Sequence, residues 1–214
     1  MLGMEMFETD NQLLLNEYTG GKIRQKDFEA EAKLWKNYKT DYAPLVDFAA
    51  AKNIRVIGTN IPRRFAAMTN LHGFIISDSL QANERGLMAP LPIPYDPELP
   101  GYKKMMEGGS EMGPGHSGEN LPKAQAMKDA TMAHFILKTG TTGKMFLHFN
   151  GSYHSDNHEG IVWYVNYWAK KYSTELKILT ISSVEQDQVE KLDSVNKGLG
   201  DFIFCFPSDM TKTF

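Results

Sequence analysis

The chain has few of the features that would assign it to a specialised class of protein. Its 214 residues contain one cysteine, so an intramolecular disulfide is excluded. No run of about 18 apolar residues is present, which excludes a membrane-spanning helix of ordinary length. Lysine and arginine number 23 against 26 aspartate and glutamate residues, which gives a net charge of −3. Without a basic surface to neutralise phosphates, nucleic acid is not an expected partner.

The first residues also lack the features of a signal peptide. The stretch MLGMEMFETDNQ has neither a basic segment nor an apolar core. It reads as a strand, LGMEMF, that runs directly into a helix, with Thr9 and Asp10 as candidate N-caps. Domains rarely open in this way, so we expect that an upstream strand and helix of the fold are missing.

Apolar periodicity predicts an alternation of helices and strands. The expected helices cover residues 10–18, 25–36, 43–52, 62–73, 122–138 and 157–171, and the expected strands cover 2–7, 54–60, 143–150, 176–181 and 201–206. Such alternation indicates one α/β domain over 1–214, with a mainly parallel sheet and helices on both faces. Residues 86–121 are rich in proline and glycine and are expected to form a lid, a binding loop or a disordered insert. Cys205, within the apolar run DFIFCF, is expected to be a buried strand residue.

Polar residues follow three of the expected strands. Glu5 lies within the first strand, Asn60 ends the second and precedes Arg63 and Arg64, and the third leads into a polar group of Asn150, Gly151, His154 and Asp156. In an open parallel sheet, ligands bind beyond the carboxyl ends of the strands. The three groups should therefore share one rim, which predicts a site there.

Each of these side chains has a structural alternative. Glu5 sits among apolar neighbours, and a buried carboxylate needs a cation, a metal or hydrogen-bond donors. An ion pair with Arg63 or Arg64 would provide this, and the same two guanidiniums would equally suit the carboxylate of a ligand. The alternative is that both arginines lie on the surface and have no functional role.

The histidines give a weaker signal. His154 and His158 are four residues apart, and Asp156 could orient one of them. No HExxH, CxxC or CxxCH motif is present, so neither a zincin site nor covalent haem attachment is supported. His154, just after a strand end, is the stronger candidate. His72, His116 and His134 are expected to be structural or surface residues.

Several motifs, in order along the chain, resemble the ChaN-like haem-binding family of iron-regulated lipoproteins. They are LGMEMFETDNQ, LWKNYKTDYAPLVDFA, TNIPRRFAAM, KDATMAHFI and HFNGSYHSDNHEGIVWYV. The wider superfamily includes erythromycin esterases and TIKI/TraB-type proteins. In that superfamily a Gly-x-x-His or Gly-Glu-x-His motif, a Glu on the next strand and a later His form a polar cluster. Here Glu5 matches the second element and Gly151–His154 the late one, while the first element is absent.

The resemblance implies an α/β fold and non-covalent haem binding. It further implies bacterial iron or haem uptake at the cell envelope, with uptake machinery as a partner, and a homodimer whose interface holds the haem through tyrosine ligation. With haem as the ligand, a phenolate could be the axial group, which makes Tyr38, Tyr42 and Tyr153 candidates. Asn60, Arg63, Arg64 and His154 complete the expected haem-binding set. Aromatic packing is the alternative for the tyrosines.

A hydrolase is the competing hypothesis, and whether the protein is an enzyme stays open. His154 would act as general base, oriented by Asp156 or Glu5, or these groups would hold a divalent metal. A third hypothesis is a non-functional fragment whose exposed sheet edge makes it prone to aggregation.

Overall fold

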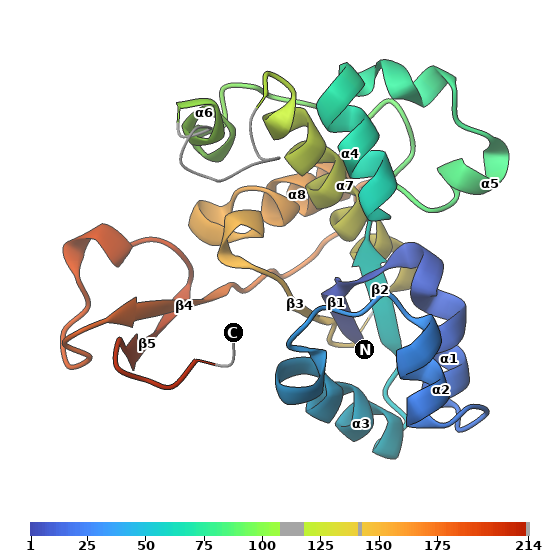
Figure 1. Ribbon diagram of the computed structural model, residues 1–214. Coiled ribbons are helices and arrows are strands. Elements are labelled where there is room, and N and C mark those ends of the chain that lie inside the picture. Colours follow the sequence, from blue (N-terminus) through green and yellow to red (C-terminus); the bar gives the residue numbers. More distant parts are fainter. Residues whose placement is uncertain (108–117, 141–142, 213–214) are drawn as a thin grey trace.

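The computed structural model describes residues 1–107, 118–140 and 143–212. Its main sheet has three parallel strands in the order β2-β1-β3, and a second sheet consists of the parallel pair β4-β5 (Figure 1). The strands are β1 (Leu2–Glu8), β2 (Val56–Asn60), β3 (Leu147–Phe149), β4 (Ile181–Gln186) and β5 (Phe202–Pro207). The prediction of an α/β fold with parallel strands is therefore confirmed.

The central strand β1 is covered on both faces, which explains why all its residues from Leu2 to Phe7 except Glu5 are apolar or glycine. Gly3 pairs with Ile57 of β2 on one side and with His148 of β3 on the other. Side chains alternate between faces along a strand, so Met4 and Glu5 point to opposite sides of the sheet. Both are buried, and Glu5 therefore needs polar partners inside the protein.

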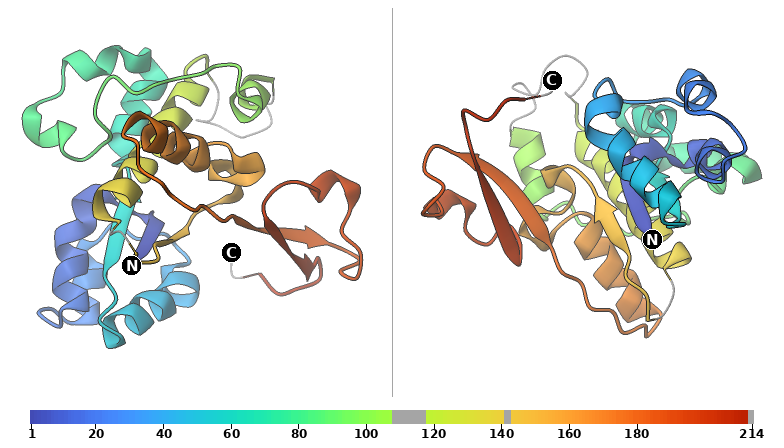
Figure 2. Two further views of the ribbon diagram at one scale, coloured as in Figure 1. Left: turned by 180° about the vertical axis from the view of Figure 1, so that it is seen from behind. Right: turned by 90° about the horizontal axis from the view of Figure 1, so that it is seen from below.

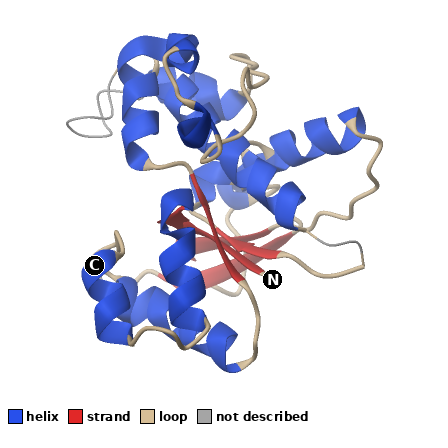
Figure 3. Ribbon diagram, turned by 90° about the vertical axis from the view of Figure 1, so that its right-hand side faces the viewer, coloured by secondary structure: helices blue, strands red, loops and turns tan. Residues whose placement is uncertain are grey.

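One face of the sheet is covered by the helices that connect β1 to β2 (Figure 3). They are α1 (Gln12–Thr19), α2 (Gln25–Glu31), a π-helical turn (Tyr38–Tyr42) and α3 (Ala43–Ala51). Their apolar side chains form one hydrophobic core with β1, built around Phe7, Leu15, Phe28 and Val46. Because α3 leads back to the start of β2, its first residues lie at the carboxyl rim of the sheet.

The other face carries a second hydrophobic core. It is formed by α4 (Arg63–His72), α6 (Pro100–Glu107), α7 (Leu121–Thr139) and α8 (Ile161–Lys171), with the short α5 (Ala82–Arg85) further out. Along α7, Ala126, Ala130 and Ala133 form a buried alanine stripe, whereas Leu137 is only partly buried. Helices thus cover both faces, as expected.

The proline- and glycine-rich region is more ordered than the sequence suggested. Within it, Met88, Ala89 and Ile93 enter the second core, and α6 buries Tyr102 and Met105. Residues 86–107 are therefore not a disordered insert, because apolar residues spaced among the prolines enter this core. The alternatives of a lid or a binding loop stay predictions. His116 lies outside the described residues.

The β4–β5 sheet stands apart from the main body, on an arm formed by residues 173–212 (Figure 2). The strand expected at 176–181 begins only at Ile181, because residues 176–180 have no neighbouring strand. Cys205 lies on β5 as predicted, but it is half-buried rather than buried. The arm meets the body through residues that follow β3.

Candidate functional site

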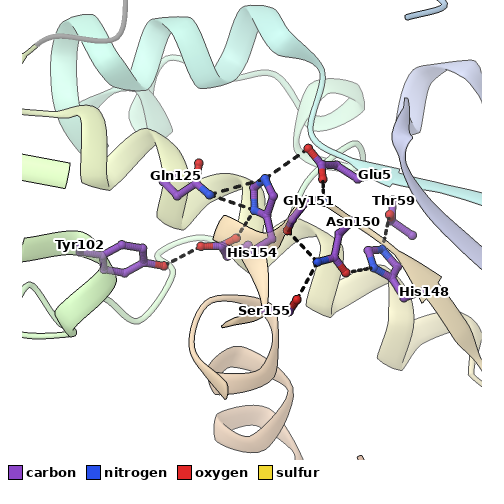
Figure 4. A network of polar contacts seen from close by, with 10 residues as sticks. Glu5, Thr59, Tyr102, Gln125, His148, Asn150, Gly151, His154 and Ser155 are labelled. Carbon is purple, nitrogen blue, oxygen red and sulfur yellow. Dashed lines mark hydrogen bonds and ion pairs between the residues drawn. The ribbon is translucent and has the colours of Figure 1, made fainter. Parts of the chain in front are cut away.

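The most concentrated polar group in the protein surrounds His154, in a 3-10 turn just after β3. Its Nε2 atom lies 3.2 Å from Oε1 of Glu5, and its Nδ1 atom lies 2.5 Å from Oδ1 of Asp129 on α7 (Figure 4). All three side chains are buried, and Asp129 has no exposed surface. The imidazole is thus held between two carboxylates, each on a different element. The predicted convergence of Glu5 and His154 is borne out by this contact.

The electrostatics of the group favour a charged imidazole. Burial alone lowers the pKa of His154, but Asp129 and Glu5 outweigh it and raise the pKa to about 9. Burial also opposes the ionisation of Glu5, yet its bonds to His154 and to the Gly151 amide hold the pKa of Glu5 below its ordinary value. For Asp129 burial prevails and raises the pKa. At neutral pH His154 is an imidazolium, with both nitrogens donating.

Further hydrogen bonds fix the two carboxylates. The Gly151 amide donates to Oε2 of Glu5 at 2.7 Å, and the hydroxyl of Tyr102 on α6 donates to Oδ2 of Asp129 at 2.9 Å. The side-chain nitrogen of Gln125 lies 3.0 Å from Nδ1 of His154. Three elements, β1, α7 and the turn after β3, therefore meet at one imidazole, and α6 reaches it through Asp129. This arrangement is suited to holding the rim in a single geometry.

A glycine shapes the loop that carries His154. Gly160 has a φ of +52°, and a Cβ atom placed there would lie 2.5 Å from the His154 carbonyl oxygen. The same atom would lie 3.2 Å from Oδ2 of Asp129. Only glycine combines this backbone conformation with so little space. Gly160, near the end of the stretch HSDNHEGI, therefore allows the loop that carries His154 to pack closely against α7.

A second histidine bridges the sheet beside the first. His148 on β3 contacts the Thr59 hydroxyl of β2 at 2.8 Å, across the central strand. This is allowed because Gly3 lies between them, and a Cβ atom there would be 2.7 Å from Cδ2 of His148. Burial lowers the pKa of His148 to about 4, although its contact with Asn150 acts in the opposite direction. His148 is neutral at physiological pH.

The tautomer of His148 follows from its partners. Nδ1 faces Oδ1 of Asn150 at 2.9 Å, and the Asn150 amide donates to the Gly151 carbonyl and to Ser155. Nδ1 must therefore carry the hydrogen, and Nε2 accepts from Thr59. Asn150, one of the predicted rim residues, thus connects His148 to the turn that holds His154.

The two arginines at the start of α4 have different surroundings. Arg64 pairs with Asp10 at 2.6 Å and lies over the ring of Phe65, 4.5 Å from its centroid. Arg63 is exposed, and among the described residues it makes no ion pair. The expected pairing of either arginine with Glu5 is wrong, because His154 occupies that place. Asn60 ends β2 as predicted, and its Oδ1 atom is enclosed without a donor among the described residues.

The three candidate tyrosines fall into three environments. Tyr38 is buried against Phe7 and Phe28, its hydroxyl has no partner among the described residues, and burial raises its pKa. Tyr42 is half-buried at the rim, and its pKa is raised by burial and by nearby Asp41 and Glu5. Tyr153 is 63% exposed. Two of the three phenols are therefore open to a ligand.

Asp156 and His158 bond to residues of the arm. Oδ1 of Asp156 accepts from Ser182 at 2.8 Å, and Nε2 of His158 lies 3.1 Å from the Thr180 hydroxyl and 3.3 Å from Oδ1 of Asp201. Of the two residues expected to orient His154, Glu5 contacts the ring, whereas Asp156 bonds to Ser182 on the arm and Asp129 takes the second ring nitrogen.

Sequence reasoning missed Asp129, Gln125, Tyr102, Thr59 and His148. Part of the signal was available, since Gln125 and Asp129 are four residues apart and flank the alanine stripe of α7. A polar pair beside a buried stripe indicates a polar partner facing that helix. The other members are isolated in sequence and are brought in only by the tertiary fold.

A pocket of about 590 Å³ lies on the α6 side of this network. Its described lining includes Tyr95, Tyr102 and Met106, together with Lys103 and Lys123. Tyr102 contacts both the pocket and Asp129, whereas neither Glu5 nor His154 is among the described lining residues. The network thus touches the pocket only through Tyr102, and the His154 ring does not line it.

No group of three or more His, Cys, Asp or Glu side chains among the described residues is arranged to hold a metal ion. Within the same residues, no helix is both long and apolar enough to cross a bilayer.

The fold and rim define an α/β protein with a parallel sheet and a buried carboxylate–imidazole network. Its sequence matches the family described as haem-binding uptake, Tiki superfamily, ChaN, over residues 1–165. The chain therefore belongs to the ChaN family of haem-binding uptake proteins, as the motifs predicted.

One solved structure supports the same fold. It is described as cofacial haem binding to ChaN of Campylobacter jejuni, and it superposes with a TM-score of 0.61 at 18% identity. The match covers 94% of this chain and 71% of the other. No curated protein matches the sequence.

Proposed function

We propose that this protein binds haem non-covalently at the carboxyl rim of its sheet and serves haem or iron uptake at the cell envelope. Family membership supports the ligand class. The observation that carries the assignment to the rim is Tyr153. Its phenol is exposed, its hydroxyl makes no hydrogen bond to a described residue, and the next residue, His154, is fixed through both ring nitrogens. A free phenol on a turn whose backbone is held in place suits ligation of ferric iron.

The residues at the rim fit haem in distinct roles. Tyr153 is the first candidate for the axial ligand and Tyr42 the second, while the enclosed Tyr38 would need its surroundings to open. Haem supplies the iron that such a phenolate ligates, and its propionates are anions. Arg63 is free to pair with a propionate and Asn60 can donate its amide, whereas Arg64 is occupied by Asp10. A homodimer and an envelope uptake partner, both implied by the resemblance, belong to this proposal.

His154 has a supporting role in this assignment. An imidazolium with both nitrogens bonded to carboxylates presents no lone pair to iron. Its function is to lock the turn that carries Tyr153 against β1 and α7. The raised pKa keeps this lock intact at neutral pH.

Haem titration followed by absorbance tests the proposal. The unaltered protein should give a saturable Soret shift, and Tyr153→Phe should weaken binding at least tenfold and change the ligand-to-metal bands. Tyr42→Phe measures the contribution of the second phenol. Tyr172→Phe is the matched control, because Tyr172 is an exposed tyrosine at the opposite end of α8. A folded protein that does not bind haem would refute the assignment. Equal losses in all three variants would refute the role of the rim.

Hydrolysis is the second candidate function. The observation that favours it is the contact of His154 with two carboxylates, Glu5 and Asp129. A histidine beside carboxylates can act as a general base, and Glu5 with His154 could bind a divalent metal. Two findings weigh against it. Both ring nitrogens are occupied, and the described pocket does not reach them. Ester and peptide hydrolysis measured with and without added Zn²⁺ or Mn²⁺ tests this. Turnover lost in His154→Gln but kept in His72→Gln would establish it.

A further inference from the structure

The pocket beside α6 is separate from the residues proposed to bind haem. Its volume, about 590 Å³, is within the range of small-molecule sites. Neither Tyr153 nor Arg63 is among its described lining residues. Aromatic rings, a methionine and charged side chains of both signs line it, and the haem proposal uses none of them. The chemistry of this lining therefore needs an explanation of its own.

The wall that α6 contributes to the pocket is fixed at the first turn of the helix. The backbone amide of Gly101 donates to Oε2 of Glu159 at 2.7 Å, and the Tyr102 hydroxyl donates to Oδ2 of Asp129 at 2.9 Å (Figure 4). Both acceptors lie outside α6, and Asp129 is itself bonded to His154. A ligand thus meets a wall that is already in place, so little binding energy is lost in ordering it.

The uncharged part of the lining is aromatic and polarisable. The rings of Tyr95 and Tyr102 are stacked, with centroids 5.7 Å apart and an interplanar angle of 26°. Because the Tyr102 hydroxyl is bonded to Asp129, this residue offers the pocket its ring rather than a free hydroxyl. Met106, which is exposed, adds a thioether. Tyrosine rings attract ammonium groups, and methionine adapts its shape to irregular apolar groups.

The two lysines of the lining are already engaged. Nζ of Lys103 lies 2.5 Å from Oε2 of Glu98, and Nζ of Lys123 donates to Oδ1 of Asn120 at 2.7 Å. An anionic ligand would have to compete with these partners for both ammonium groups. The lysines therefore do not favour an anion here.

The two glutamates of the lining have no such partners. Glu107 and Glu119 are exposed, and their carboxylates make no ion pair or hydrogen bond with any residue that the structure describes. Glu98 raises the pKa of Lys103, and Glu107 and Asp96 act in the same direction. Three carboxylates thus act on one ammonium group, so this end of the pocket carries an excess of negative charge.

We propose that this pocket binds an organic cation, a quaternary ammonium group carried on an aromatic or apolar body. The unengaged carboxylates of Glu107 and Glu119 attract the charge, and this attraction needs no hydrogen bond from the ligand. The rings of Tyr95 and Tyr102 contact the methyl groups and the body. The volume of the pocket suits a molecule with such a body better than a small inorganic ion. This inference goes beyond the proposed haem function and does not depend on it.

Three probes that share a benzyl group but differ in the charge of the head test the proposal in the haem-free protein. They are benzyltrimethylammonium, 2-phenylethanol and phenylacetate. NMR titration should give saturable shifts with benzyltrimethylammonium, and 2-phenylethanol should bind about tenfold more weakly. Phenylacetate should bind least, because the carboxylates of the pocket repel it. Equal affinity for the neutral probe, tighter binding of phenylacetate, or no binding to the folded protein would each overturn the proposal.

Removing the two carboxylates tests their role without disturbing the core. Glu107→Gln combined with Glu119→Gln keeps the shape of two exposed side chains. The double variant should bind benzyltrimethylammonium about tenfold more weakly, while its affinity for 2-phenylethanol stays unchanged. Glu175→Gln, which removes an exposed carboxylate on the arm, is the matched control and should change neither affinity. No loss in the double variant, or an equal loss in the control, would contradict a role for the pocket.

The aromatic wall is tested by Tyr95→Leu, which removes a ring but keeps an apolar side chain. It should weaken benzyltrimethylammonium binding about tenfold. Tyr172→Leu, at an exposed tyrosine just after α8, is the control and should leave binding unchanged. Unchanged binding in a folded Tyr95→Leu variant would show that the ring is not part of the site.

A competition experiment separates this pocket from the haem site. Haem added to protein saturated with benzyltrimethylammonium should bind as it does without the probe, because Tyr153 does not line the described pocket. Competition between the two would place the probe at the rim and overturn the inference. A protein that binds the probe but no haem would refute the haem proposal alone, and one that binds haem but no probe would refute this inference alone.

Discussion

The Nε2 atom of His154 lies 3.2 Å from Oε1 of Glu5, so a loop after β3 is fastened to the middle of the central strand. Both side chains are buried, and neither would be stable there as an isolated charge. The contact stabilises the rim and places Tyr153 beside it. It also makes the protein sensitive to changes in the partners of His154, which leads to the following predictions.

Removing Asp129 should be far more damaging than removing Asp156. Asp129→Asn leaves a buried imidazolium with one carboxylate less, and breaking a buried charge pair costs about 3–5 kcal/mol. Asp156→Asn affects a hydrogen bond to Ser182 on the arm, which contributes on the order of 1 kcal/mol. Urea unfolding of both variants measures the difference. Equal free energies of unfolding would show that Asp129 does not hold His154.

Stability should fall as the pH rises from neutral toward 9. The folded pKa of His154, about 9, is above its ordinary value of 6.5, so its contribution is complete below pH 6.5 and is lost through pH 9. The largest expected loss is about 3 kcal/mol. Urea unfolding between pH 6 and 10 checks the slope. His154→Gln should flatten it, and His72→Gln, an exposed histidine on α4, should leave it unchanged.

Gly3→Ala should destabilise the sheet. The added methyl group would lie 2.4 Å from the Phe146 ring and 2.7 Å from that of His148, which must move and lose its contact with Thr59. Overpacking of this kind costs about 1–3 kcal/mol. The variant Gly86→Ala is the control, since its nearest neighbour would be at an ordinary 3.4 Å. Proton NMR should also show the His148 pKa moving up from about 4. An unchanged value would mean that His148 does not bridge the strands.

Arg63→Ala and Arg64→Ala should separate ligand binding from stability. Arg63 has no ion-pair partner within the described part of the chain, so its loss should weaken haem binding about tenfold, equivalent to about 1.4 kcal/mol, while the unfolding midpoint stays the same. Arg64 is bound to Asp10, so its loss should lower stability by up to about 1 kcal/mol and change haem affinity less than threefold. The reverse pattern would assign the ligand contact to Arg64.

The sequence predicted the elements better than the contacts between them. Apolar periodicity and runs of β-branched residues predicted β1, β2 and β5. The expectation that the strands are parallel then predicted that Glu5 and His154 lie close together. Asp129 was missed because its importance depends on which face of α7 meets a residue far along the chain. The bond of Asp156 to Ser182 likewise depends on where the arm lies, which has no local signal in the sequence.

The order in which the strands appear along the chain has a consequence for biosynthesis. β1 and β2 leave the ribosome early, and the helices between them can bury the Met4 face of β1 at once. Glu5, on the other face, must wait for its partners, the Gly151 amide and the His154 ring, which are translated last of the network. Until then the nascent chain carries an uncompensated carboxylate at the centre of its sheet. We therefore expect the amino-terminal half to remain loosely docked, and open to chaperones, until the turn after β3 has emerged.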